Sequence, residues 1–234
     1  MTIAIRFGCG LVLAASLLAV SAATARTSDP APAPAPVSPE AEGVAQVVTA
    51  AQVAAWGRAH QDAGALIMAA RILAEVPVRA APAGDASPPI LTPAALLDEA
   101  AALSMGDQAA LDAIAYLRAQ NPGDADPATS GVRGVRSSPF GQGPIFMVRQ
   151  IRARETWGFD VEARGGEVLR VAAIGDGDTN IDMSVRDADG AVVCRDGFGD
   201  HYPVCTVARA RAGKMRIDIV NRGAIWTKVQ ILSN

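Results

Sequence analysis

Residues 214–220 read KMRIDIV, and this stretch decides how the C-terminal part of the chain folds. Met215, Ile217 and Ile219 alternate with charged residues, so a strand formed here has one apolar face and one charged face. Strands with one face in a core and the other in water are typical of antiparallel sheets.

The same alternation extends over residues 145–234. Short runs rich in Val, Ile and aromatic residues are separated there by turns that contain Gly, Asp or Asn. The eight runs are IFMVRQI, TWGFDVEA, EVLRVAAI, IDMSVRD, AVVC, YPVCTV, KMRIDIV and IWTKVQIL. Short strands at this spacing predict an antiparallel β-sandwich domain over residues 145–234.

Residues 40–120 have a helical period instead. In residues 40–59, EAEGVAQVVTAAQVAAWGRA, small apolar side chains recur every three or four residues. Asp62 and Thr92 are residue types that cap helix N-termini, and a loop is expected from Pro77 to Pro89. The sequence therefore predicts an α-helical hairpin module over residues 40–120, followed by the sandwich, in an α+β chain of two parts.

Residues 1–25 have the three parts of a secretory signal peptide. Arg6 gives a positive start, an apolar run follows, and Ala23-Thr24-Ala25 forms a cleavage site. The apolar run is shorter than the roughly 20 residues of a membrane-spanning helix. We therefore predict cleavage after Ala25, no stable membrane span in the mature chain, and a periplasmic or secreted location.

Two segments are predicted to connect the folded parts. Residues 26–39, RTSDPAPAPAPVSP, form a Pro/Ala-rich spacer, because this composition favours extended and solvated backbone. Residues 121–144 begin with Asn-Pro-Gly and contain further glycines, which predicts a flexible linker between the helical module and the sandwich.

The overall composition excludes some classes of protein. The chain has 21 Lys and Arg against 24 Asp and Glu, for a net charge of −3, which argues against a nucleic-acid partner. Two His and three Cys leave little material for a transition-metal site. There is no G-x-S-x-G nucleophile elbow, so we expect no catalytic residues and a protein that is not an enzyme.

The cysteines predict a disulfide. Cys9 leaves with the signal peptide, and Cys194 and Cys205 remain as an even pair in an exported chain. The residues between them contain Asp-Gly and Gly-Asp, which are turn material between two short β-prone runs. We predict that the disulfide joins neighbouring strands.

An acidic turn is the first candidate binding site. Its side-chain oxygens fall on every second residue, at Asp176, Asp178, Asn180 and Asp182. Calcium needs six to eight oxygen ligands, and a turn with several carboxylates is one way to supply them. The alternative is ordinary turn chemistry, in which Asp and Asn side chains accept hydrogen bonds from the turn backbone.

The loop between the cysteines is the second candidate site, as a contact surface for a partner. Its candidate residues are Asp196, Phe198, Asp200, His201 and Tyr202. The aromatic members, together with Trp157 and Trp226, form either an exposed stacking platform for a sugar or peptide or part of the core.

Two segments carry a resemblance to a known family. They are GDGDTNIDMSVRDADGAVVCRDGFGD, residues 175–200, and RIDIVNRGAIWTKVQILSN, residues 216–234. Over about residues 145–234 the chain resembles the bacterial pre-peptidase C-terminal domain. Departures from the family pattern are Asn180 for an acid, Met183 for Leu, and the cysteine pair.

The resemblance implies a jelly-roll-like sandwich on a secreted protein, without catalysis of its own and with calcium or polymeric ligands in some relatives. The sequence thus predicts an exported, non-enzymatic binding or scaffolding protein whose partner is an unidentified protein or polysaccharide. The alternative is a calcium-stabilised polysaccharide- or protein-binding module, and the third reading is a hydrolase accessory or weak enzyme. No cofactor is expected other than this calcium.

Overall fold

A computed structural model describes residues 35–81, 87–120 and 138–234. The predicted signal peptide, most of the predicted spacer and most of the predicted linker therefore lie outside the described residues. The helices and strands below all belong to one compact unit, residues 34–234.

The helical part consists of α1 (Pro39–His60), α2 (Ala63–Glu75), α3 (Pro93–Leu103) and α4 (Gln108–Gln120). The first three helices begin at Ser38, Asp62 and Thr92, whose side-chain oxygens accept the backbone N–H three residues further on. The capping roles predicted for Asp62 and Thr92 are confirmed. α1 and α2 approach closely at Gly57, where a Cβ atom would lie 3.0 Å from the Cβ of Ala65.

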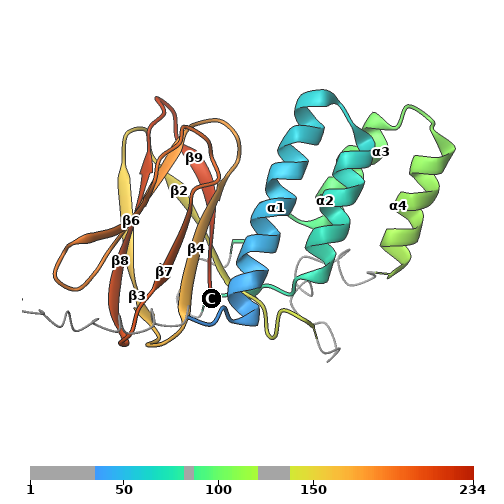
Figure 1. The fold of residues 1–234 in the computed structure, drawn as a ribbon. Coiled ribbons are helices and arrows are strands. Elements are labelled where there is room, and N and C mark those ends of the chain that lie inside the picture. Colours follow the sequence, from blue (N-terminus) through green and yellow to red (C-terminus); the bar gives the residue numbers. More distant parts are fainter. Residues whose placement is uncertain (1–34, 82–86, 121–137) are drawn as a thin grey trace, which may run out of the picture. The chain divides into compact units, whose positions relative to one another are not determined.

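Two sheets complete the fold (Figure 1). Sheet A has the strand order β1-β2-β9-β4-β7, and sheet B has the order β3-β8-β5-β6. The strands are β1 (Arg79–Ala80), β2 (Ile145–Ile151), β3 (Thr156–Ala163), β4 (Val168–Gly175), β5 (Ile181–Arg186), β6 (Val192–Asp196), β7 (Val204–Ala208), β8 (Gly213–Asn221) and β9 (Thr227–Ser233). The predicted α+β fold with a sandwich is confirmed, and β2 to β9 each fall on one of the eight predicted runs.

One short strand departs from the expectation. Arg79–Ala80 lies in the segment predicted as a loop, yet it pairs with β2 as β1. This pairing is parallel, whereas the other strand pairs in the described residues are antiparallel. The prediction of a loop throughout Pro77–Pro89 is therefore wrong at these two residues, which are too few to show a periodic pattern.

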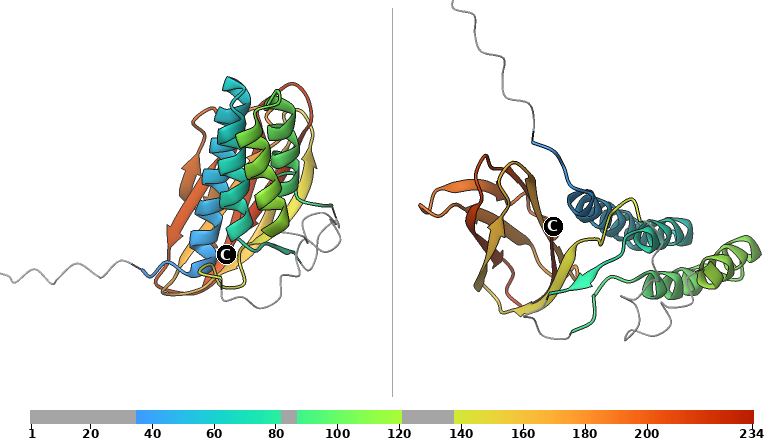
Figure 2. Two further views of the ribbon diagram at one scale, coloured as in Figure 1. Left: turned by 90° about the vertical axis from the view of Figure 1, so that its right-hand side faces the viewer. Right: turned by 90° about the horizontal axis from the view of Figure 1, so that it is seen from below.

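Sheet A has apolar side chains on both of its faces. On β9, Val229 and Ile231 pack into the core between the two sheets, whereas Leu232 packs into a second core with the helices. Strand β4 is divided in the same way, with Val171 on the sandwich side and Ile174 on the helical side. The helices therefore form a third layer against sheet A (Figure 2).

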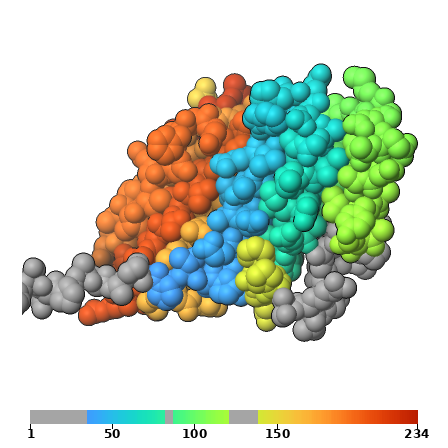
Figure 3. All heavy atoms as spheres, turned by 45° about the vertical axis from the view of Figure 1, so that its right-hand side comes forward, coloured from blue at the N-terminus to red at the C-terminus, as the bar shows by residue number. Residues whose placement is uncertain are grey.

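The helical layer is joined to the sandwich through α1, which lies against β4 and β9. Val44, Val47 and Val48 of α1 share one buried cluster with Phe146 and Val148 of β2. Figure 3 shows α1 between the strands and α2, with no break in the surface on that side. The apolar stripe of α1 is thus the part of the helical module that covers the sheet.

Polar contacts hold the same interface. The guanidinium Nη1 of Arg170 donates to the carbonyl oxygen of Ala41 at 2.9 Å. Asn234 donates through Nδ2 to Ser38 Oγ and to the carbonyl of Val168. The beginning of α1 and the end of the chain are therefore tied to β4.

Candidate functional site

The two segments predicted as binding sites meet at one end of the sandwich. The amide of Gly175, at the start of the acidic turn, donates to the carbonyl of His201 at 2.9 Å. The amide of Ile181 donates to the carbonyl of Asp200 at the same distance. A Cβ atom at Gly175 would lie 2.5 Å from Ile181 Cδ1 and 3.1 Å from His201 Cβ, so a larger residue there would displace these side chains.

Two of the four predicted calcium ligands are engaged within the chain. Asp176 accepts from the Thr227 hydroxyl at 2.6 Å and from the Lys228 amide at 2.9 Å. Asp182 accepts from Arg222 Nε at 2.6 Å through one carboxylate oxygen, Oδ2. Asp176 therefore fastens the acidic turn to the start of β9, and Asp182 fastens it to the segment between β8 and β9, whereas Asp178 is exposed.

Other oxygens of the same turn have no partner among the described residues. Thr179 Oγ1, Asn180 Oδ1 and Asp182 Oδ1 are shielded from water and make no hydrogen bond there. Buried oxygens of this kind cost free energy unless a ligand, ion or water molecule satisfies them. In residues 35–81, 87–120 and 138–234, however, no group of three or more His, Cys, Asp or Glu is placed to hold a metal ion.

The loop between β6 and β7 is held at both ends. Asp196 accepts the amide of Val204 at 2.8 Å through Oδ2, and Asp200 accepts the amide of Tyr202 at 3.0 Å through Oδ1. At the tip between these two anchors, Phe198 is 92% exposed. Asp196 and Asp200 thus shape the loop, and Phe198 is the residue that the loop presents to solvent.

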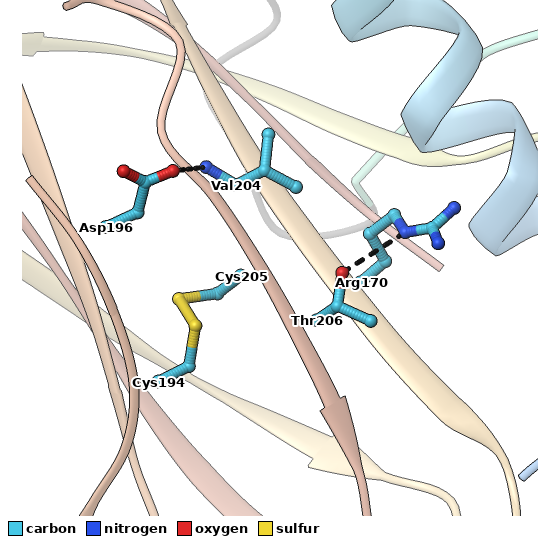
Figure 4. Close-up of a disulfide and its surroundings, with 6 residues drawn as sticks. All are labelled: Arg170, Cys194, Asp196, Val204, Cys205 and Thr206. Atoms are coloured by element: carbon cyan, nitrogen blue, oxygen red, sulfur yellow. Dashed lines mark hydrogen bonds between the residues drawn. A yellow bond between two sulfur atoms is a disulfide. The ribbon is translucent and has the colours of Figure 1, made fainter. Parts of the chain in front are cut away.

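The disulfide Cys194–Cys205 is present, as predicted (Figure 4). Cys194 lies on β6 of sheet B and Cys205 on β7 of sheet A, and the two strands are edge strands of their sheets. The bond therefore joins strands that are consecutive in the chain but belong to opposite sheets. It closes one edge of the sandwich at the base of the Phe198 loop.

The other aromatic candidates do not gather into one platform with Phe198. Trp157 is partly buried, stacks on Phe159 with ring centroids 5.1 Å apart, and packs against the sandwich core. Tyr202 is partly buried against the cluster that joins helices and sheet. Trp226 is 50% exposed in the segment between β8 and β9. The core interpretation holds for Trp157, and the exposed interpretation holds for Phe198 and Trp226.

A cavity of about 330 Å³ lies between α1 and this end of the sheet. Ala51, Ala55 and Arg58 contribute one stripe of α1 to its wall, and His201 and Tyr202 contribute part of the opposite side. The remaining lining residues are Ile90, Leu91, Ile174, Gly175, Asp176 and Gly177. Residues of both predicted sites therefore line the cavity, together with residues of α1, a helix that the sequence did not indicate as part of a site.

Arg58 is the residue in this cavity that the sequence analysis missed. Its Nε and Nη2 each donate to Glu99 of α3 at 2.7 Å, and this hydrogen-bonded pair raises the pKa of the guanidinium. Burial raises the pKa of the Tyr202 hydroxyl; the nearby Arg58 charge opposes this shift, and Asp200 adds to it. The available signal was the position of Arg58, a lone basic residue seven places after Ala51 on a stripe of alanines.

The histidines occupy positions with local partners. His60 Nδ1 lies 2.8 Å from the carbonyl oxygen of Trp56, and the two rings stack. His201 makes an edge contact with the ring of Tyr202. Across the described residues, no hydrogen bond joins either imidazole to a serine, threonine or cysteine side chain.

None of the helices in these residues has the length and hydropathy to cross a membrane.

Comparison with known proteins gives a limited result. No family model and no curated protein matches the chain, so the resemblance to the pre-peptidase C-terminal domain stays a prediction. Part of the fold is similar to PliG, a periplasmic lysozyme inhibitor of g-type lysozyme from Aeromonas hydrophila. That likeness has 15% identity and a TM-score of 0.29 over 39% of this chain and 86% of the inhibitor.

Two further solved structures match part of the chain with similarly low TM-scores. A de novo designed double-stranded β-helix matches at 15% identity and a TM-score of 0.25, over 38% of this chain and 97% of the design. The Yersinia pseudotuberculosis-derived mitogen matches at 9% identity and a TM-score of 0.23, over 35% of this chain and 86% of the mitogen. Likenesses at these TM-scores carry no argument about function, which must come from the residues of the chain.

Proposed function

We propose that the chain is an exported, non-enzymatic binding protein that contacts its partner, a protein or a polysaccharide, through the loop between β6 and β7. The observation that carries this proposal is the 92% exposure of Phe198 on a loop anchored at both ends. An exposed aromatic ring supplies a large contact area at an interface. Because the loop is already ordered, binding costs little further conformational entropy.

Export is supported by two independent features. The N-terminal sequence has the pattern of a signal peptide, and the Cys194–Cys205 bond requires an oxidising compartment to persist. The absence of catalysis is part of the proposal and rests on the chemistry of the two sites. Four carboxylates of the two predicted sites, those of Asp176, Asp182, Asp196 and Asp200, accept hydrogen bonds from backbone, hydroxyl or guanidinium groups.

The test compares Phe198→Ala with Met105→Ala. Met105, between α3 and α4, is 94% exposed, so the two variants remove equally exposed apolar side chains from different places. The purified chain and both variants are immobilised and tested for retention of purified peptidoglycan, chitin and dextran, and of proteins from an envelope extract. We expect Phe198→Ala to weaken retention about tenfold or more, as for an interface hot spot. Equal loss in both variants, or none in either, contradicts the proposal.

A second candidate function is calcium binding by the acidic turn. The specific observation in its favour is the set of oxygens without partners, Thr179 Oγ1, Asn180 Oδ1 and Asp182 Oδ1, beside the exposed carboxylate of Asp178. Oxygen ligands from carboxylate, amide and hydroxyl groups fit the preference of Ca²⁺. Asp176 already accepts two hydrogen bonds from β9, so we leave it out of the proposed ligands.

Calcium binding is tested by thermal unfolding with CaCl₂ and then with excess chelator. An ion that binds the folded chain at 100 times its Kd stabilises it by about 2.7 kcal/mol, which raises the Tm by about 5 °C or more. Asp178→Ala removes this rise in our proposal, whereas Asp189→Ala, which changes an exposed acid in the turn after β5, keeps it. An unchanged Tm for the unmodified chain at millimolar calcium rejects this second function.

A further inference from the structure

Some polar groups in the wall of the cavity between α1 and the sheet have hydrogen-bond partners within the chain, and others do not. Arg58 uses Nε and Nη2 for Glu99, and its third nitrogen, Nη1, donates to no atom of the described residues. The hydroxyl of Tyr202 also has no hydrogen-bond partner in the described part of the chain, and it is not shielded from solvent. Two residues that line one cavity thus each keep a donor that no described residue occupies.

The acceptor in the cavity wall is already in use. Both carboxylate oxygens of Asp176 accept hydrogen bonds, from the Thr227 hydroxyl and from the Lys228 amide. Each oxygen of Asp176 keeps a further lone pair, but a ligand carboxylate would meet donors on Arg58 and Tyr202 that are not occupied. Arg58 is also held in place by its two bonds to Glu99, so its remaining edge is presented at little cost in side-chain entropy.

Part of the wall is aliphatic. Ala51, Ala55 and Ile174 line the cavity together with Ile90 and Leu91. Its volume of about 330 Å³ leaves space for a short aliphatic body next to the charged group. We propose that this cavity binds a carboxylate carried on a small aliphatic body, with Arg58 and Tyr202 as the residues that recognise the carboxylate. This site shares the loop between β6 and β7 with the contact through Phe198, but Phe198 does not line it and the proposal does not depend on that contact.

Two sources have this chemistry: a free branched carboxylic acid and the C-terminal residue of a peptide. The probes that separate them are 4-methylpentanoate, N-acetyl-leucine and N-acetyl-leucinamide, the last of which has the same body but no charge. Binding is followed by amide chemical shifts of the ¹⁵N-labelled chain. A ligand of this size is expected to bind with a Kd of about 1 mM, so titration to about 20 mM reaches saturation.

The expected result is that a carboxylate binds and the amide does not. Equal affinity for both carboxylates assigns the site to a free acid, and tighter binding of N-acetyl-leucine assigns it to a peptide terminus. Arg58→Gln is expected to weaken binding about tenfold or more, and Tyr202→Phe about threefold to tenfold. Binding of N-acetyl-leucinamide with the same affinity, or no shift with any probe, overturns the proposal.

Matched variants separate this site from a general loss of structure. Arg118→Gln breaks the ion pair of Arg118 with Asp98, which joins α4 to α3 on the surface, and does not touch the cavity. It is expected to keep the affinity of the unmodified chain. Loss of carboxylate binding in Arg118→Gln would mean that the helical layer, not the Arg58 side chain, governs the effect, and it would overturn the assignment.

Discussion

The side-chain oxygen of Gln230, in the middle of β9, accepts a hydrogen bond from the backbone amide of Leu91 at 3.3 Å. It also accepts the amide of Ile90, at 3.0 Å. Gln230 is only 1% exposed, and it faces the helical layer from sheet A. One buried amide side chain thus fixes the segment that leads into α3, and this segment also forms part of the cavity wall.

We expect Gln230→Met to lower the free energy of unfolding by about 1–3 kcal/mol, because two amides in a partly buried place lose their acceptor while the side-chain volume is nearly kept. Urea-induced unfolding measures the change. Gln150→Met is the control: Gln150 lies on the neighbouring strand β2 but is exposed, so a change within about 0.5 kcal/mol is expected. Equal stability of the two variants would show that the Gln230 contact contributes nothing.

The strands and helices could be predicted from the sequence because their signals are local. Alternation as in 214–220, capping residues such as Asp62 and a helical stripe of small residues each specify one element. The helical cover on sheet A was also signalled, since β4 reads VLRVAAIG and does not alternate as a half-exposed strand would. The two-residue strand β1 was missed because two residues have no period.

The candidate site could be predicted only in part. The acidic turn and the loop between the cysteines were identified, and the structure brings them together. Which loop side chains face outward was not predictable, since a loop has no period that separates Phe198 from Tyr202. The role of Arg58 depends on how α1 docks on the sheet, which is a contact between segments that are distant in sequence.

The two cysteines of the Cys194–Cys205 bond are 11 residues apart in the sequence. The bond is expected to contribute about 2–3 kcal/mol to the free energy of unfolding, because it closes a short loop in the unfolded chain. Replacing both cysteines by alanine should lower the urea midpoint, and reductant should lower the midpoint of the unmodified chain by a similar amount. The double variant should not respond to reductant. A chain whose midpoint is the same with and without reductant would contradict this expectation.

Asn221 is fully buried at the end of β8 and connects two turns. Its Nδ2 donates to the carbonyls of Ile151, Arg152 and Ile225, and its Oδ1 accepts the amide of Gly223. We expect Asn221→Ala to lower the free energy of unfolding by about 3 kcal/mol. Asn221→Asp should lower the free energy of unfolding further at neutral pH, because it places a carboxylate against carbonyl oxygens. Chemical denaturation gives the order, and an aspartate variant more stable than the alanine variant would show that the donated bonds do not matter.

Tyr202 provides a prediction in the alkaline range. Burial raises the pKa of its hydroxyl above the ordinary value of 10.0, so the folded chain retains the proton at a pH where the unfolded chain releases it. The stability that this gives is fully present below the unfolded pKa and is lost as the pH rises from there through the folded pKa. Stability of the unmodified chain should therefore decrease with pH above about 10, and Tyr202→Phe should reduce this slope.

The measurement is direct because the chain has two tyrosines, and the other, Tyr116 on α4, is 64% exposed. In Tyr116→Phe the ultraviolet titration of phenolate reports Tyr202 alone, and in Tyr202→Phe it reports Tyr116. We expect the first curve to lie at higher pH than the ordinary tyrosine pKa of 10.0. If the first curve lies at the ordinary value instead, Tyr202 is as well solvated as a free tyrosine, and the expected decrease of stability with pH is contradicted.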